Sequence, residues 1–289
     1  MKMKNNARIL FLCLLIVLSM LLGACAPSAP SATEAPVAPA APVDTEAPAA
    51  TEAPTAEPVT LVVFAAASLT DAYAEIASAF QAANPGVTVS YNFAGSQTLL
   101  TQVQEGAEAD VFAPASKKQM DVLVGSGAVT VESKIQVKNK LTVVVSSSAA
   151  NLTKLEDLAA AGVKVVLAAK EVPAGDYALK TLDSLNAVYG ADFSAKVLAN
   201  TVSYENSVKA VTAKVQLGEA DAAIVYVTDA SAAQLNTIMI PDENNQIASY
   251  PIAVLGASKN AEMAQKFVDF ILSAEGQTIL AKWGFLPGE

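Results

Sequence analysis

Residues 61–81, "LVVFAAASLTDAYAEIASAFQ", decide the fold class of this chain. An apolar run typical of a buried strand ends in three alanines and Ser68, and a helical pattern follows at once. Within that pattern, large apolar residues recur at helical spacing: Leu69, Tyr73, Ile76 and Phe80. A strand that leads directly into a helix is the repeating unit of α/β folds, in which helices cover a mostly parallel sheet.

The same unit recurs further along the chain. Asn84-Pro85-Gly86 ends the first helix, and "VTVSYNF" (87–93) then alternates as a strand. The pattern predicts further helices at 96–106, 153–161, 175–189 and 207–217, and further strands at 109–115, 138–148, 163–169, 197–202, 222–227 and 250–255. Two last helices, separated at Gly276, complete the chain. "EGAEADVFAPAS" and "LGEADAAIVYVTDAS" echo each other and favour two similarly built lobes.

The first 58 residues have the character of an export signal and a linker. Basic residues precede a 14-residue apolar run, which is short for a membrane span and typical of a secretory signal. The following Leu22-Gly23-Ala24-Cys25 resembles the bacterial lipobox, so we expect lipid attachment at Cys25; a plain signal peptide is the alternative. Residues 26–58 hold eight of the 14 prolines and no Lys or Arg, which predicts a disordered linker.

The composition of residues 59–289 excludes several classes of function. Three of the chain's 18 basic residues and five of its 28 acidic residues lie before position 59. Residues 59–289 therefore contain 15 Lys and 23 Asp and Glu, and they contain no Arg, His or Cys. An acidic chain without a basic patch is a poor nucleic-acid binder. Without His or Cys, the usual zinc, thiol and imidazole chemistries are missing, although a Ser–Lys hydrolase remains possible.

Two strand-to-helix turns carry the polar groups that suggest a site. Ser68 and Ser96 each follow a strand, and ligands of open α/β sheets bind beyond the carboxyl ends of the strands. The amides at a helix N-terminus, together with a serine hydroxyl, form a natural anion site. The alternative for each serine is a helix cap, with Asp71 completing the capping pattern at Ser68.

Six segments in order make the chain resemble a known family. "VVFAAASLTDAYAEIASAF", "NFAGSQTLLTQVQEGAEADVFAPAS", "LTVVV", "EVPAGDYALKTL", "GEADAAIVYVTDA" and "YPIAVL" together resemble the substrate-binding proteins of molybdate ABC importers, over nearly all of 60–287. The resemblance implies a periplasmic-binding-protein fold of type II. Its two α/β lobes, each a mostly parallel sheet flanked by helices, would bind molybdate or tungstate in the cleft between them.

The resemblance also implies which residues bind the ligand. The family's two serines, two backbone amides and one tyrosine hydroxyl match Ser68, Ser96, Ala174, Val208 and Tyr226. The match at Val208 could shift by one residue to Ser207. Some relatives carry several serines in the second loop, whereas Gly95 and Gln97 flank a single serine here. Tyr226 could alternatively be an ordinary core tyrosine.

The sequence therefore predicts a binding protein and not an enzyme. We expect a signal peptide over 1–25, a linker over 26–58, one lobe from 59–140 plus 240–289, and the other from 141–239, with hinges near 139–142 and 228–250. The expected ligand is molybdate or tungstate, with no cofactor and no bare metal ion. The expected partners are a membrane ABC permease and its ATPase, and the protein would be a lipid-anchored or periplasmic monomer. The alternatives are another oxyanion such as sulfate, a serine-dependent envelope hydrolase, and a structural lipoprotein.

Overall fold

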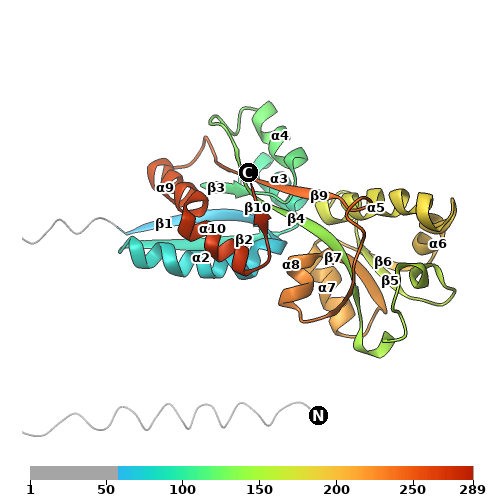
Figure 1. Ribbon diagram of the computed structural model, residues 1–289. Coiled ribbons are helices and arrows are strands. Elements are labelled where there is room, and N and C mark those ends of the chain that lie inside the picture. The colour runs from blue at the N-terminus through green and yellow to red at the C-terminus, as the bar shows by residue number, and fades with distance from the viewer. Residues whose placement is uncertain (1–57, 289) are drawn as a thin grey trace, which may run out of the picture. The chain divides into compact units, whose positions relative to one another are not determined.

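The computed structural model describes residues 58–288, which form a mixed α/β fold (Figure 1). The predicted signal peptide, Cys25 and almost all of the predicted linker lie outside the described residues. A 10-stranded sheet has the order β2-β1-β3-β9-β4-β7-β5-β6, and β8 and β10 pair with β4. None of the helices within 58–288 is both long and apolar enough to cross a membrane.

The first half of the sheet contains three parallel strands with helices between them. β1 pairs in parallel with β2 and with β3. The elements of this half are β1 (Val59–Ala66), the 3-10 turn η1 (Ala67–Leu69), α2 (Thr70–Ala83), β2 (Val87–Ala94), α3 (Ser96–Gln104), β3 (Val111–Ala113), α4 (Lys117–Gly125), α9 (Ala261–Leu272) and α10 (Ala274–Lys282). The predicted apolar stripe of α2 is confirmed, because Leu69, Tyr73, Ile76 and Phe80 are all buried.

The second half repeats this plan with three parallel strands. β5 pairs in parallel with β6 and with β7. Its elements are η2 (Ser147–Ala149), η3 (Leu155–Ala159), β5 (Val165–Ala168), α5 (Pro173–Tyr189), α6 (Phe193–Ala199), β6 (Thr201–Glu205), α7 (Val208–Gln216), β7 (Ala222–Tyr226), α8 (Val227–Ala232) and β8 (Asn236–Ile238).

Two long antiparallel strands join the halves. β4 (Lys134–Val145) pairs with β9 (Ile247–Val254) up to Lys140 and with β7 from Leu141 onward. The short β10 (Leu286–Pro287) also pairs with β4. In Figure 1, β4 and β9 run between the two groups of parallel strands. Each half is therefore parallel as predicted, but the strands that connect them make the sheet mixed.

Three predicted elements differ in the structure. The helix expected at 153–161 is the shorter 3-10 turn Leu155–Ala159. The strand expected at 197–202 begins only at Thr201, because the preceding residues form α6 and bury Phe193 and Val197 on one face. The last two helices separate at Ser273 and not at Gly276. Gly276 lies within α10, where a Cβ atom would come within 2.3 Å of the Phe270 carbonyl oxygen, so its small size serves close packing.

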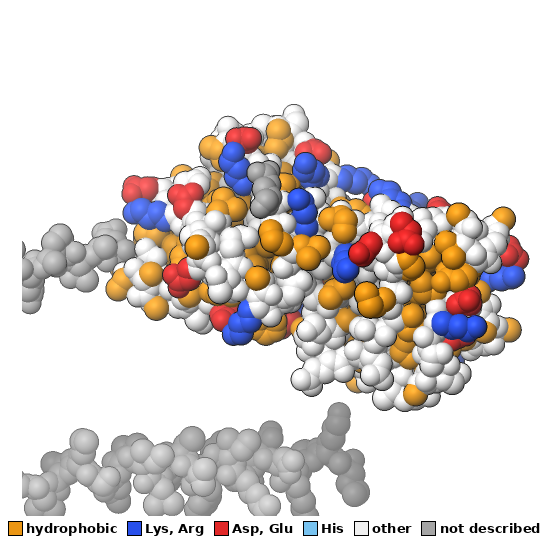
Figure 2. Space-filling view, in the orientation of Figure 1, with side chains coloured by type: hydrophobic (Ala, Val, Ile, Leu, Met, Phe, Trp, Pro, Cys, Tyr) orange, Lys and Arg blue, Asp and Glu red, His pale blue; other side chains and the backbone are white. Residues whose placement is uncertain are grey.

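Charged side chains of both signs are interspersed over the face shown in Figure 2. In the composition, 28 Asp and Glu exceed 18 Lys and Arg, which gives a net charge of −10. A net negative charge does not favour binding of a polyanion such as nucleic acid.

Candidate functional site

One small cavity lies where strands of both halves end. Its lining contains all five residues that the sequence singled out, namely Ser68, Ser96, Ala174, Val208 and Tyr226. The remaining lining residues are small or apolar: Ala66, Ala67, Ala94, Gly95, Ala115, Val172 and Pro173. The space open to the centre of a water-sized group is ≈ 10 Å³, about what one such centre requires. The structure thus brings the five residues together, and their ligand-binding role stays a prediction.

Ser68 is not a helix cap. It lies inside the 3-10 turn η1, α2 begins after Leu69, and no side chain caps either helix. Its hydroxyl instead lies 2.9 Å from the hydroxyl of Tyr250 on β9. The capping alternative fails because the 3-10 turn places Ser68 too early to reach the free amides of α2 and leaves its hydroxyl facing the interior.

Ser96 is the first residue of α3, and its hydroxyl has a fixed polarity. The amide of Ala115 donates to Ser96 Oγ at 3.0 Å. Because an amide N–H can only donate, the serine oxygen is the acceptor in this bond, and its own proton remains available. Ser96 therefore keeps a proton that it can donate to a group in the cavity that it lines.

The two predicted amides belong to the first turns of α5 and α7, where amides lack partners within the helix. α5 begins at Pro173, the residue type that suits this position, and Ala174 follows it. At α7, Ser207 caps the helix by accepting from the amide of Ala210 at 3.3 Å. Val208 lines the cavity and Ser207 is absent from its lining, so the structure places Val208 at the predicted position. Both helices direct the positive ends of their dipoles at the cavity.

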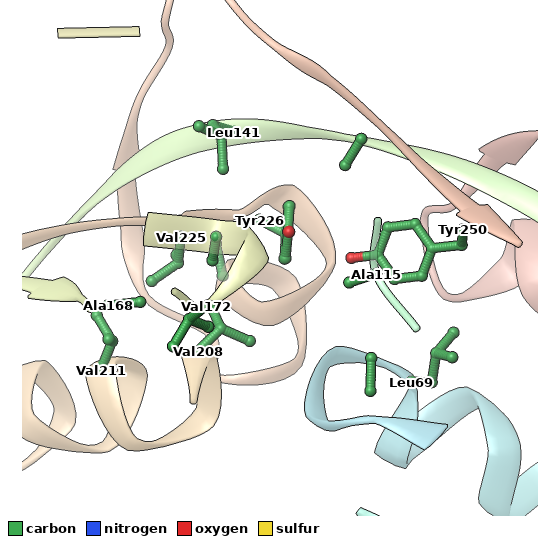
Figure 3. Close-up of a cluster of buried hydrophobic side chains, with 14 of the residues drawn as sticks. Leu69, Ala115, Leu141, Ala168, Val172, Val208, Val211, Val225, Tyr226 and Tyr250 are labelled. Carbon is green, nitrogen blue, oxygen red and sulfur yellow. The ribbon is translucent and has the colours of Figure 1, made fainter. Parts of the chain in front are cut away.

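Tyr226 ends β7 and is buried, with 1% of its surface exposed. Its hydroxyl has no hydrogen-bond partner among residues 58–288. The ring of Tyr250 lies 5.8 Å away (Figure 3), and the two hydroxyls influence each other electrostatically without a bond of good geometry. Burial, and next the nearby Tyr250, raise the pKa of Tyr226 well above its usual value. The hydroxyl is therefore a protonated, unpaired donor.

A buried carboxylate that the sequence did not single out lies near Tyr226, one of the cavity-lining residues, and helps to raise the pKa of that tyrosine. Asp229 on α8 is 1% exposed, and neither carboxylate oxygen has a hydrogen-bond partner within the described part of the chain. Lys209 Nζ lies 3.8 Å from Asp229 and 2.5 Å from Asp71 on α2. Burial raises the pKa of Asp229 to about 7, and Lys209 opposes this shift. A single Asp soon after a strand gives no signal of such burial in the sequence.

Contacts join the two halves next to residues that line the cavity. The side-chain amide of Gln97 donates to the carbonyl oxygen of Asn206 at 3.0 Å. A Cβ atom on Gly95 would lie 2.2 Å from that same oxygen. Lys209 and Asp71 form a further ion pair between the halves. Gln97, which departs from the serine-rich loop of some relatives, therefore contributes to closure.

The cavity can bind a small anion through neutral groups. None of its lining residues is charged, and the donors are hydroxyls and amides at helix N-termini. Aligned dipoles of this kind stabilise negative charge without a cationic side chain. Within the described residues there is no group of three or more His, Cys, Asp or Glu side chains that could hold a metal ion.

Comparisons with known proteins show the family of the chain. The family model described as "Bacterial extracellular solute-binding protein" matches residues 61–286. The molybdate-binding protein ModA of Mycobacterium tuberculosis is 37% identical over 231 residues, which cover 78% of this chain and 84% of the relative.

Two solved structures share the fold at low identity. The periplasmic molybdate-binding protein of Azotobacter vinelandii is 18% identical with a TM-score of 0.71, covering 79% of this chain and 100% of that one. The sulfate-binding protein SubI of M. tuberculosis is 19% identical with a TM-score of 0.70, covering 79% and 87%. The chain belongs to the bacterial extracellular solute-binding proteins, and among them it is ModA-like.

Proposed function

We propose that this protein captures molybdate outside the cell membrane and delivers it to an ABC-type permease. The observation that carries the proposal is the small, uncharged cavity lined by the five predicted donors: Ser68, Ser96, Ala174, Val208 and Tyr226. The ModA relatives, which are named as molybdate-binding proteins, support the choice of ligand. In this role the five residues hold the oxyanion, and the contacts between the halves close over it.

The donors explain why a fully deprotonated oxyanion suits the site. No carboxylate lines the cavity, so an anion that must donate a proton of its own, such as monohydrogen phosphate, would lack an acceptor. Molybdate, tungstate and sulfate have the same charge and shape. Discrimination among them must therefore come from the size of the ion. Only an ion of the right size can contact the donors of both halves at the same time.

Titration calorimetry with molybdate, tungstate, sulfate and phosphate tests the proposal. We expect molybdate and tungstate to bind tightly and with similar strength, because the two ions are nearly the same size. Sulfate should bind much more weakly and phosphate hardly at all. Sulfate binding of equal strength, or no binding of molybdate, contradicts the assignment. The fold shared with SubI makes sulfate the second candidate, with less support because the identity is only 19%.

We also propose that the protein binds without catalysing a reaction. A serine hydrolase needs a base beside its nucleophile. Ser68 instead contacts a tyrosine hydroxyl and Ser96 an amide, and no lysine lines the cavity. An ester-hydrolysis screen that compares the wild type with Ser68→Ala tests this part, and a turnover that depends on Ser68 would contradict it.

The N-terminal region supports export and anchoring. We propose cleavage before Cys25, lipid attachment there, and a linker over 26–58 that lets a monomeric binding body reach its permease and ATPase. The lobes would comprise 59–140 plus 240–289 and 141–239; the change of partner along β4 between Lys140 and Leu141 supports the first hinge. Radiolabelled palmitate should label the wild type in a bacterial host and leave Cys25→Ser unlabelled, and equal labelling would contradict the anchor.

A further inference from the structure

We propose that Tyr250 is a positioning residue for the anion, which donates its hydroxyl proton to Ser68 and so turns the proton of Ser68 into the cavity. The inference rests on the proposed function, because it takes Ser68 to donate to a bound oxyanion. Tyr250 would act through Ser68 and not on the ligand itself.

The position of Tyr250 fits an indirect role. It lies in β9, is 0% exposed and is absent from the cavity lining, yet its hydroxyl is 2.9 Å from Ser68 Oγ. In Figure 3 its hydroxyl points to the side where Tyr226 lies, a cavity-lining residue whose ring centroid is 5.8 Å from that of Tyr250. Burial is the largest cause that raises the pKa of Tyr250 above its usual value, so its hydroxyl keeps its proton.

Asn139 on β4 sets the direction of the hydrogen bond. Its Oδ1 accepts from the amide of Lys140 at 3.0 Å, which fixes the orientation of the side-chain amide. Its Nδ2 therefore faces Thr228 Oγ1 at 2.8 Å and the hydroxyl oxygen of Tyr250 at 3.5 Å. At 3.5 Å this N–H is a weak donor to the Tyr250 oxygen, and its presence on that side favours the arrangement in which the tyrosine proton points at Ser68.

The consequence is that both serines face the cavity as donors before a ligand arrives. At Ser96 the amide of Ala115 imposes this polarity, and at Ser68 the pair of Asn139 and Tyr250 imposes it. In the opposite orientation, the Ser68 hydroxyl would donate its proton to Tyr250 and would turn a lone pair toward the anion. Donors oriented in advance bind more tightly because less order must be created on binding.

The experiment is a double-mutant cycle on molybdate affinity in the full-length protein. Tyr250→Phe keeps the ring and removes the hydroxyl, and we expect a Kd weaker by roughly 3- to 10-fold, the effect of one hydrogen bond. In a Ser68→Ala background, Tyr250→Phe should weaken the Kd no further, because the hydroxyl that Tyr250 positions has been removed. It should keep its full effect in a Ser96→Ala background. Molybdate is titrated into the millimolar range so that the weakened variants are measured.

A matched control separates positioning from stability. Tyr73 is also fully buried, and its hydroxyl donates to Gln136 at 2.6 Å, outside the cavity lining. Tyr73→Phe should lower the melting temperature and leave the Kd unchanged. The proposal is overturned if Tyr250→Phe binds like the wild type, if its effect persists in Ser68→Ala, or if Ser68→Ala itself binds normally. Failure of the wild type to bind molybdate would instead refute the proposed function.

Discussion

Lys209 Nζ on α7 lies 2.5 Å from Asp71 Oδ2 on α2, so an ion pair joins a helix of one half to a helix of the other. Both side chains are about one-third exposed, at 32% and 36%. An ion pair with this exposure contributes modestly, on the order of 1 kcal/mol or less. Because it joins the two halves, we expect it to break when the halves separate.

Asp71→Asn should therefore speed ligand release. We expect the molybdate dissociation rate to rise by roughly 2- to 5-fold, because the closed form loses one contact. The association rate should not fall, since removing a negative charge does not repel an anion. Stopped-flow measurements separate the two rates. Asp192→Asn, which breaks the exposed pair with Lys196 on α6, is the control and should release ligand at the wild-type rate. An unchanged dissociation rate in Asp71→Asn would show that the ion pair of Lys209 and Asp71 does not slow ligand release.

Gly95→Ala should impair closure without unfolding the protein. The φ of −60° at Gly95 suits any residue, but a Cβ there would approach the Asn206 oxygen of the other half to 2.2 Å. We expect the Kd for molybdate to weaken by roughly 10-fold or more, with little change in melting temperature without ligand. Gly175→Ala provides the contrast, because its clash at 2.1 Å with Ala169 lies within one half. That variant should lose stability itself. Normal affinity in Gly95→Ala would show that the approach is not needed for binding.

Tyr226→Phe should separate binding from stability. The variant removes a buried hydroxyl that has no partner among the described residues, so the ligand-free protein should be as stable as the wild type or more stable. The Kd for molybdate should weaken by roughly 10- to 100-fold, as expected for a hydrogen bond to a charged group. Thermal melts and calorimetry measure the two effects. A variant that melts earlier yet binds normally would make Tyr226 an ordinary core residue.

Asp229 should make stability fall as the pH rises. An ordinary aspartate releases its proton near 3.8, but in the folded protein the pKa of Asp229 is raised to about 7, mainly by burial. Between these values the folded state holds a proton that the unfolded state has lost, so the free energy of unfolding decreases from about pH 4 to pH 7. Lys209 and Asp71 are the charged groups that face it, and they act in opposite directions.

Urea denaturation at pH 5 and pH 8 checks this contribution. Asp229→Asn should unfold at a higher urea concentration than the wild type at pH 8, and the difference should shrink at pH 5. Asp269→Asn on the exposed face of α9 serves as the control and should follow the wild type at both values. If Asp229→Asn shows the same difference from the wild type at pH 5 and pH 8, the carboxyl does not titrate in this window.

Local patterns in the sequence determined most of the secondary structure. The apolar spacing of α2 and the Asn84-Pro85-Gly86 stop reflect interactions within a few residues, and both agree with the structure. The expected strand at 197–202 and the break at Gly276 failed for a different reason. At 197–202 the helix α6 forms and buries Phe193 and Val197, and at Gly276 the close approach of α10 to the end of α9 requires a residue without a side chain, so in both cases packing between elements decides what the residue type alone does not.

The sequence alone also placed five residues for a site, through small residues at strand ends and through family resemblance. Only the tertiary structure showed that Ser68 is bonded to Tyr250, 182 residues away, and does not cap its helix. The same holds for the burial of Asp229 and for the approach of Gly95 to Asn206. The propensity of a segment to form a helix or a strand depends on residues that are neighbours along the chain. The direction of a hydroxyl proton and the pKa of a carboxylate depend instead on groups that meet only when β4 and β9 bring the two halves together.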